Sequence, residues 1–519
     1  MLFRKLASTL FLTLGAAGFA SIAACSVITG SDIGLGLGQP CETDDECQAS
    51  KCIENVCTRE CAEDADCPEG SACLDTLVCS QGPAPSVPVG QACTASTECL
   101  TGTCGSDGLC TKPCEATTEC PAPSECFAGF CQIPLDVGFI WVGVVEDQGW
   151  TKTHDIGREY ALEQLPYLRA DFVTNVFKDP EATDALNAFV EDGKDVIVAN
   201  SFSLRNQTSG VADSNPDTQF LVCAGNVTKD NLGTYFARSY QAWYLAGYTA
   251  ASKSQTGRLG FVGSYVTPEL VRHIDAFTLG AKRADPSVKV EVRWEGFWFD
   301  VDPPNADQEY RETVLANELI ETGCDVIAHG SDNGRVVEAV EKAHDMGDDV
   351  WSIGNDNIDA CKLGPSSCIG VPYWNWGPLY VRIFDQIHRG TWDPKVPIND
   401  NILVNLDESI VSFGATEDLL SNDLKISLGE LRADLASDPK LAFRGPYDVN
   451  ANQRSQGDVT NGEEISDEEL ATMCWFVEGV IEKEDPLDPL SADVPARVPW
   501  GDVQIPPGSG NTPDCRVNQ

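Results

Sequence analysis

The chain has 519 residues and a formal net charge of −45, with 80 acidic residues against 35 basic ones. A protein that binds nucleic acid needs a basic surface, so this charge excludes that class of partner. The length exceeds what one hydrophobic core usually supports, and we therefore expect two or more domains.

The N-terminus has the pattern of a secretory signal. Arg4 and Lys5 precede the uncharged apolar segment 6–24, which ends in small residues. The four residues that span the expected cleavage point, Ile22-Ala23-Ala24-Cys25, resemble a bacterial lipobox. This resemblance implies that residues 1–24 are removed and that Cys25 carries the acyl chains. A plain signal peptide and an uncleaved membrane helix are the alternatives.

Lipidation would place the protein in the cell envelope, on the periplasmic or cell-surface side of a membrane. Residues 25–40 then form a Gly-rich tether. Residue 26 is Ser rather than the aspartate associated with retention at the inner membrane, which favours the outer membrane of a Gram-negative-type envelope.

Cysteine usage marks the next region, residues 41–131. It holds 16 of the 23 cysteines, in two copies of one eight-cysteine pattern at 41–79 and 93–131. The fifth cysteine of each copy begins a weaker half-repeat. Behind a signal peptide, disulfides are the default state, and they must replace a core that has few apolar residues. A zinc array is the alternative, but neither copy has a Cys-x-x-Cys pair or a histidine. The connectivity stays open, and we favour a stalk over a partner-binding module.

From about residue 135, short apolar strands alternate with helical segments. We expect strands at 139–145, 172–177, 196–199, 219–223, 259–262, 288–294, 326–329 and 350–353, and helices at 154–165, 180–191, 240–252, 268–283, 307–321 and 334–346. This alternation predicts an α/β fold with parallel sheets that helices cover on both faces. One sheet would be too long, so we expect two lobes, 136–256 and 257–370, with the break near Gly257.

The pattern weakens in the last part of the chain. Residues 371–485 should return to and complete the two lobes, and residues 486–519 form a Pro-rich arm. Within them we expect one or two helices at 417–434, turns at 443–459 and an amphipathic helix at 465–482. Two disulfides are proposed here, Cys361–Cys368 and Cys474–Cys515.

Ligands of open α/β sheets bind beyond the carboxyl ends of the strands, so the loops that follow the strands are the candidate site. These loops are 146–151, 200–203, 264–265, 330–333, 354–357 and 373–376. All six carry polar groups and four also carry an aromatic ring. Flat rings suit stacking on a planar heterocycle, and carboxylates and amides orient its polar edge. Closure of two lobes would exclude water and strengthen these bonds.

The sequence contains no pattern that identifies an enzyme. A Gly-x-Ser-x-Gly elbow, a His-Glu-x-x-His zinc motif and a phosphate-binding loop are all missing from it. His154 beside Asp155 could act as a base, and His329 with Asp332 could form a hydrolytic pair. Neither has an oriented nucleophile, and a helix-packing role is the better interpretation of His154. We therefore expect no catalytic residue, no cofactor and no metal site.

Residues from about 136 to 480 resemble the basic membrane protein family of solute-binding lipoproteins. The matching segments are, in order, 149–158, 235–242, 268–272, 276–281, 298–300, 354–356, 374–378, 445–446 and 475–480. The resemblance implies a two-lobed type I periplasmic-binding-protein fold, a purine base or nucleoside as ligand, and the permease of an ABC transporter as partner. An extracellular sensor or adhesion receptor, in which the Cys-rich repeats contact a partner, is the alternative.

The resemblance also implies which residues bind. By position, Trp150 and Tyr265 are the stacking pair and Asp356 is the orienting carboxylate. The remaining candidate ligand-binding residues are Thr151, Asn200, Ser201, Phe202, Ser331, Asp332 and Trp374. The loop that ends at Trp150 begins Glu146-Asp147-Gln148 where nucleoside-binding members tend to carry a Gly-Asp loop and Phe. A free base such as adenine is therefore as plausible as a nucleoside.

Overall fold

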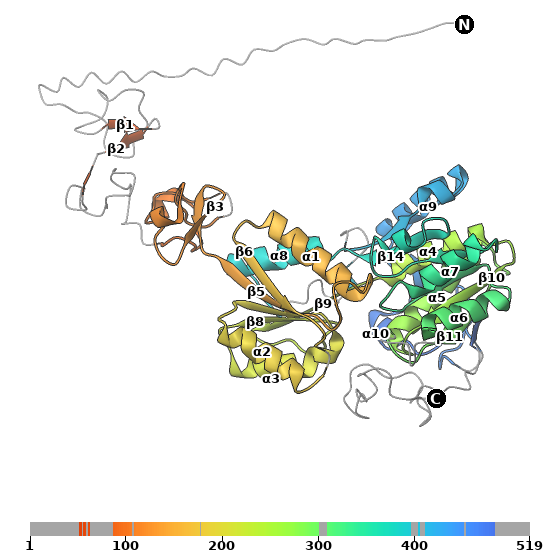
Figure 1. Cartoon of the computed structure of the whole chain (residues 1–519). Coiled ribbons are helices and arrows are strands. Elements are labelled where there is room, and N and C mark those ends of the chain that lie inside the picture. The colour runs from red at the N-terminus through yellow and green to blue at the C-terminus, as the bar shows by residue number, and fades with distance from the viewer. Residues whose placement is uncertain are drawn as a thin grey trace, which may run out of the picture. The chain divides into compact units, whose positions relative to one another are not determined.

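The computed structural model describes residues 51–53, 56–58, 61–62, 87–105, 108–176, 178–299, 309–395, 403–404, 410–450 and 453–482 (Figure 1). The predicted signal peptide, lipobox, tether and Pro-rich arm lie outside these residues, as does most of the first Cys-rich repeat. Among the described residues, no helix is both long and apolar enough to span a bilayer.

Crossed disulfides close each half of the second Cys-rich repeat. Cys93–Cys104 and Cys99–Cys110 close the first half, and Cys114–Cys126 and Cys120–Cys131 close the second. The short elements between them are η3 (Ser96–Glu98), η4 (Thr117–Glu119), β3 (Glu125–Phe127) and β4 (Phe130–Gln132). In the first repeat, β1 (Lys51–Ile53) pairs with β2 (Val56–Thr58). The eight cysteines of the second repeat are thus all oxidised, which confirms disulfides over zinc there, and Cys61 of the first repeat is also disulfide-bonded.

The second repeat is attached to the first lobe. Only two residues separate β4 from β5 (Leu135–Ile140), which lies next to the edge strand of that lobe's sheet. The guanidinium of Arg169 forms an ion pair with Glu125 and lies 5.9 Å from the ring centre of Phe127. This repeat therefore packs against the edge strand β6 (Leu168–Val173) of the lobe.

Lobe 1 is built on a six-stranded parallel sheet in the order β15-β9-β8-β7-β5-β6. Its other strands are β6 (Leu168–Val173), β7 (Val196–Ala199), β8 (Gln219–Cys223), β9 (Leu232–Ala237) and β15 (Leu403–Val404). Helices α1 (Trp150–Gln164) and α8 (Trp376–His388) cover one face, and α2 (Glu181–Glu191) and α3 (Arg205–Ser214) cover the other (Figure 1). The inner strands β7, β8 and β9 are buried and consist mostly of apolar residues, whereas the edge strand β6 is partly exposed and contains Arg169 and Asp171.

Lobe 2 is built on a seven-stranded sheet in the order β16-β14-β13-β12-β10-β11-β17, in which only β16 is antiparallel to its neighbour. Its strands are β10 (Arg258–Gly263), β11 (Lys289–Trp294), β12 (Val326–His329), β13 (Trp351–Ile353), β14 (Cys368–Trp374), β16 (Val411–Ala415) and β17 (Val480–Glu482). Its helices are α4 (Tyr240–Lys253), α5 (Pro268–Ala284), α6 (Arg311–Glu321), α7 (Arg335–Asp345), α9 (Asn422–Ser437) and α10 (Asp467–Ala471). The two-lobed α/β architecture with parallel sheets agrees with the sequence prediction.

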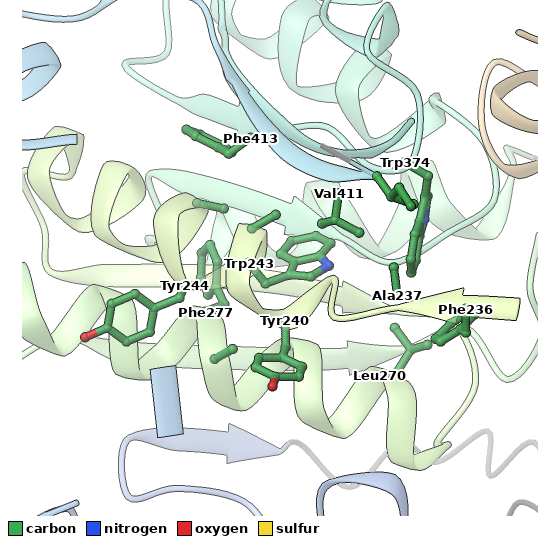
Figure 2. Close-up of a cluster of buried hydrophobic side chains, with 14 of the residues drawn as sticks. Phe236, Ala237, Tyr240, Trp243, Tyr244, Leu270, Phe277, Trp374, Val411 and Phe413 are labelled. Carbon is green, nitrogen blue, oxygen red and sulfur yellow. The ribbon is translucent and has the colours of Figure 1, made fainter. Parts of the chain in front are cut away.

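Helix α4 packs in lobe 2, although the predicted boundary near Gly257 would put it in lobe 1. Its Trp243 ring lies 5.2 Å from Phe261 of β10 and 6.3 Å from Phe277 of α5. Figure 2 shows Trp243 of α4 and Phe277 of α5 in one apolar cluster with Val411 and Phe413 of β16. The chain therefore leaves lobe 1 at Arg238 and Ser239, between β9 and α4. Strand–helix alternation cannot reveal this, because it does not say which sheet a helix covers.

The C-terminal part differs most from the prediction. The segment 465–482, predicted as one helix, contains only the short α10 before the chain extends into β17, which pairs with β11. Strands β9, β14 and β16 and helices α3 and α8 were not predicted. The helix in 417–434 is present as α9. The Cys361–Cys368 disulfide is present; Cys474 is disulfide-bonded, and its predicted partner Cys515 lies outside the described residues.

Close approach of α4 and α5 depends on two glycines. A Cβ atom added at Gly280 would lie 1.9 Å from the carbonyl oxygen of Tyr244, and one at Gly247 would lie 1.8 Å from that of Phe277. Each helix therefore presents a glycine to the backbone of the other.

We expect Gly280→Ala to lower the free energy of unfolding by about 1–3 kcal/mol or more, because the backbones would have to separate. Gly429→Ala is the matched control, since Gly429 is an exposed residue of α9 with open space around it. Gly429→Ala should raise the free energy of unfolding by about 0.4–1 kcal/mol, because alanine reduces the conformational freedom of the unfolded chain. Chemical denaturation of both variants measures this, and equal effects would contradict the tight helix crossing.

Candidate ligand-binding site

A cavity lies between the two lobes at the carboxyl ends of their strands. Its empty volume is about 570 Å³, part of which is open to solvent. Lobe 1 lines it with Val142, Trp150, Ser201, Phe202, Ala224 and Phe236, and lobe 2 with Glu269, Leu270, His273, Trp298, Gly330, Asp332, Asn355 and Asp356. This size and this mixture of aromatic walls with a few polar groups are typical of small-molecule sites.

The lobes touch each other around the cavity. A Cβ added at Gly149, at the start of α1, would lie 2.0 Å from the carbonyl oxygen of Asp332 in lobe 2. Asn357 donates from Nδ2 to the carbonyl of Gln148 at 3.1 Å. Across the cavity, the Phe202 and Trp298 rings meet edge to face at 6.0 Å. The structure is therefore a closed form, in which a bound molecule would be largely shielded from water.

Asp147 organises the loop that carries Trp150. Its carboxylate accepts hydrogen bonds of 2.9–3.0 Å from the backbone N–H groups of Gly149, Thr151 and Lys152, which are otherwise unpaired at the start of α1. Burial raises the pKa of Asp147 to about 6, against the opposing effect of these bonds. Thr151 is buried beside this carboxylate and supports the loop rather than lining the cavity.

The ring of Trp150 is held from several sides. Its Nε1 donates to the carbonyl of Asn200 at 2.9 Å, and the Asn200 side chain accepts from the N–H of Val142 at 3.0 Å. Trp374 and Trp376 lie edge-on to it at 5.7 and 6.1 Å. Asn200 and Trp374 therefore act behind the wall of the cavity, and Trp150 forms the wall.

In lobe 2 the aromatic wall is Trp298. Tyr265, the predicted partner of Trp150, is not among the lining residues; its ring stacks on that of Trp298 at 6.2 Å with 20° between the planes. Tyr265 ends a strand-end loop as expected, but the loop after β11 places Trp298 between it and the cavity. Tyr265 therefore supports the wall from outside.

Among the described residues, three carboxyl groups face the cavity: Glu269, Asp332 and Asp356. Asp356 has a positive φ of 61°, and its Oδ1 accepts from Trp374 Nε1 at 2.8 Å. Its Oδ2 is buried without a hydrogen-bond partner in the described part of the chain. Burial, with the charge of neighbouring carboxylates, raises the pKa of Asp332 and of Asp356 well above the ordinary value. Burial also raises the pKa of Glu269 to about 7, although Arg272 opposes it.

The histidines show no catalytic pairing. His154 is fully buried, stacks on Trp376 at 4.8 Å, and shares a 2.6 Å hydrogen bond with Tyr380, while Asp155 pairs with Arg158 and Lys152. Burial lowers the pKa of His329 to about 3. His273 lines the cavity, and its Nε2 shares a 2.5 Å hydrogen bond with Ser239.

Five of the ten predicted site residues line the cavity: Trp150, Ser201, Phe202, Asp332 and Asp356. The other five, Thr151, Asn200, Tyr265, Ser331 and Trp374, lie behind it; Ser331 is buried and donates to Glu295. Sequence reasoning missed Phe236, which lies within β9, and Glu269, Leu270 and His273, which lie in the first turns of α5. The position of α5 in the sequence could have indicated the residues in its first turns. A helix that follows a strand-end loop begins at the same edge of the sheet as that loop.

Comparisons with known proteins agree with this geometry. The family model described as "ABC transporter substrate-binding protein PnrA-like" matches residues 135–433. A purine-binding protein of Brucella abortus is 30% identical over 357 residues, which cover 69% of this chain and 95% of that protein. A putative ABC transporter glucose-binding protein of Haloferax volcanii is 30% identical over 299 residues, 56% of this chain and 73% of that protein. A solute-binding protein structure from Aeropyrum pernix K1 has the same fold, with a TM-score of 0.50 and 17% identity, covering 62% of this chain and 95% of that one.

Glu269 should give stability a distinct pH dependence. Its carboxyl titrates near 4.5 when unperturbed and near 7 in the folded protein, so the folded state holds the proton more tightly between these values. Its contribution to the free energy of unfolding is therefore greatest below about pH 4.5, decreases as the pH rises through this window, and is lost above about pH 7.

Glu269→Gln removes this titration. We expect the variant to gain stability relative to the wild type between pH 5 and pH 8, as measured by denaturant unfolding at each pH. A difference that does not change with pH would show that Glu269 has an ordinary pKa.

Proposed function

Because this chain belongs to the PnrA-like family of ABC transporter substrate-binding proteins, we propose that it captures a purine base or nucleoside outside the cytoplasm and delivers it to an ABC permease. One observation carries the choice of ligand. The closed cavity has aromatic walls from both lobes, Trp150 and Trp298, and a buried carboxylate oxygen of Asp356 that no described group satisfies.

This arrangement suits a flat heterocycle. Stacking of a base on an aromatic side chain contributes about 1–3 kcal/mol. An N–H group of the ring would satisfy Asp356 Oδ2, which is otherwise a buried acceptor without a partner in the described part of the chain, and leaving such an acceptor unpaired is costly. Binding and release by opening of the lobes need no catalytic residue, and we propose that the protein is not an enzyme.

Membrane attachment completes the proposal. Cys25 follows the lipobox-like residues, and acylation there would tether the binding domain to the outer membrane through residues 25–40. We expect Cys25→Ala to abolish incorporation of radiolabelled palmitate and to move the protein from the detergent phase to the aqueous phase in phase partitioning. Unchanged labelling would contradict lipidation at Cys25.

A thermal-shift panel tests the ligand class. It contains adenine, guanine, hypoxanthine, adenosine, guanosine and inosine, with glucose as the alternative that the name of the Haloferax relative suggests. A ligand present at 100 times its Kd adds about 2.7 kcal/mol to the free energy of unfolding and so raises the melting temperature. We expect at least one purine, and not glucose, to do so. A shift with glucose alone would show that the purine assignment is wrong.

Two variants separate stacking from closure within this panel. Trp150→Ala removes one wall, and Gly149→Ala keeps every wall residue but places a methyl group against the backbone of Asp332. For both variants, we expect that at least ten times more ligand is needed to produce the same rise in melting temperature. Gly210→Ala is the control, because a Cβ at Gly210 in α3 meets no atom within 4 Å.

A further inference from the structure

Three N–H donors in or behind the cavity wall already have partners within the protein. Trp150 Nε1 donates to the carbonyl of Asn200, and Asn355 Nδ2 donates to that of Ser331 at 3.2 Å. Trp374 Nε1, behind the wall, donates to Asp356 Oδ1. These N–H groups hold the walls in place. Because each already donates to a protein acceptor, it is less able to donate a hydrogen bond to a ligand.

Acceptors, in contrast, are in excess. The buried Oδ2 of Asp356 has no partner in the described part of the chain, and Asp356 is only 5% exposed. The carboxyl groups of Asp332 and Glu269 also face the cavity. Burial raises the pKa of both Asp332 and Asp356, and Asp147 lies close enough that its charge raises the pKa of both further. A ligand that complements this site must bring N–H donors.

Positive charge does not balance these acids at the cavity wall. Among the described lining residues there is no Lys or Arg, and burial keeps His273 neutral by lowering its pKa. Arg272 follows in the same helix turn as Glu269, but its guanidinium is directed to the backbone carbonyls of Pro268 and Leu470. A ligand with a phosphate or another negative charge would therefore lose its hydration in a site of low dielectric constant without finding a cation to pair with.

We propose, building on the purine-binding function above, that this cavity selects purines that carry an exocyclic amino group and rejects phosphorylated purines. The amino group supplies two N–H donors, one for the buried, unpaired Oδ2 of Asp356 and one for the neighbouring carboxyl groups that line the cavity. A purine without it leaves Asp356 Oδ2 unsatisfied, and a site built to hydrogen-bond a group discriminates strongly against the analogue that lacks it.

Matched ligand pairs test the selection by isothermal titration calorimetry on the whole protein. Adenine and unsubstituted purine differ only in the 6-amino group, and guanosine and inosine differ only in the 2-amino group. We expect the amino compound of at least one pair to bind tenfold or more tightly, and AMP to bind at least a hundredfold more weakly than adenosine. Equal affinities within both pairs, or AMP binding as tightly as adenosine, would overturn the proposal.

Amide variants identify the groups responsible. Asp356→Asn keeps an oxygen for Trp374 Nε1 and replaces the other oxygen by an N–H donor. Asp332→Asn likewise replaces one carboxyl oxygen of Asp332 by an N–H donor. Either variant should reduce the preference for the amino compound to less than threefold. Asp348→Asn, a matched change of charge at an exposed residue of lobe 2, should leave it intact. If the preference for the amino compound persists in both variants, Asp356 and Asp332 do not recognise the amino group, and this part of the proposal is wrong.

The two proposals fail in different ways. If every purine binds but the amino group has no effect, the selection proposed here is wrong and purine binding stands. If no purine binds and glucose does, the purine-binding function itself is wrong, and the selection falls with it.

Discussion

Contact between the start of α1 and the loop after β12 is the constraint on which the site depends. Gly149 approaches the backbone of Asp332 so closely that no side chain fits between them. The same loop carries Trp150, and Asp332 itself faces the cavity. Closure of the lobes and assembly of the binding wall are therefore one event: the residues that bring the lobes together are direct neighbours of those that would hold a ligand.

The segments that cross between the lobes are tied to this wall. The stacked rings of Trp374 and Trp376 lie where the chain passes from β14 of lobe 2 to α8 of lobe 1, and both meet Trp150 edge-on. Trp374 also holds Asp356 by its indole N–H. At the crossing from β9 to α4, Ser239 shares a hydrogen bond with His273 in the wall. Rearrangement at these two crossings would thus change the cavity wall, which is how a ligand can favour the closed form of a two-lobed protein.

The second Cys-rich repeat uses a different source of stability. Its four disulfides hold a segment with little apolar core, and its contacts through Glu125 and Phe127 join it to β6 of lobe 1. Lobe 1 is therefore continuous with this repeat, whereas lobe 2 is joined to lobe 1 by crossing segments and by contacts around the cavity. Any opening motion consequently moves lobe 2 relative to the repeat.

The amino-acid sequence by itself determined the features that depend on local patterns. Buried parallel strands are short apolar runs, so β7, β8 and β12 were predicted with their observed bounds, and the strand-end rule found Trp150, Phe202, Asp332 and Asp356. Only the tertiary structure decided what depends on contacts between distant segments. It placed α4 in lobe 2, replaced the predicted helix at 465–482 by a strand that β11 recruits, and put Trp298 rather than Tyr265 in the wall. Periodicity records which face of a segment is buried, but not against which partner, and that choice is made when segments far apart in the chain compete for the same apolar surface.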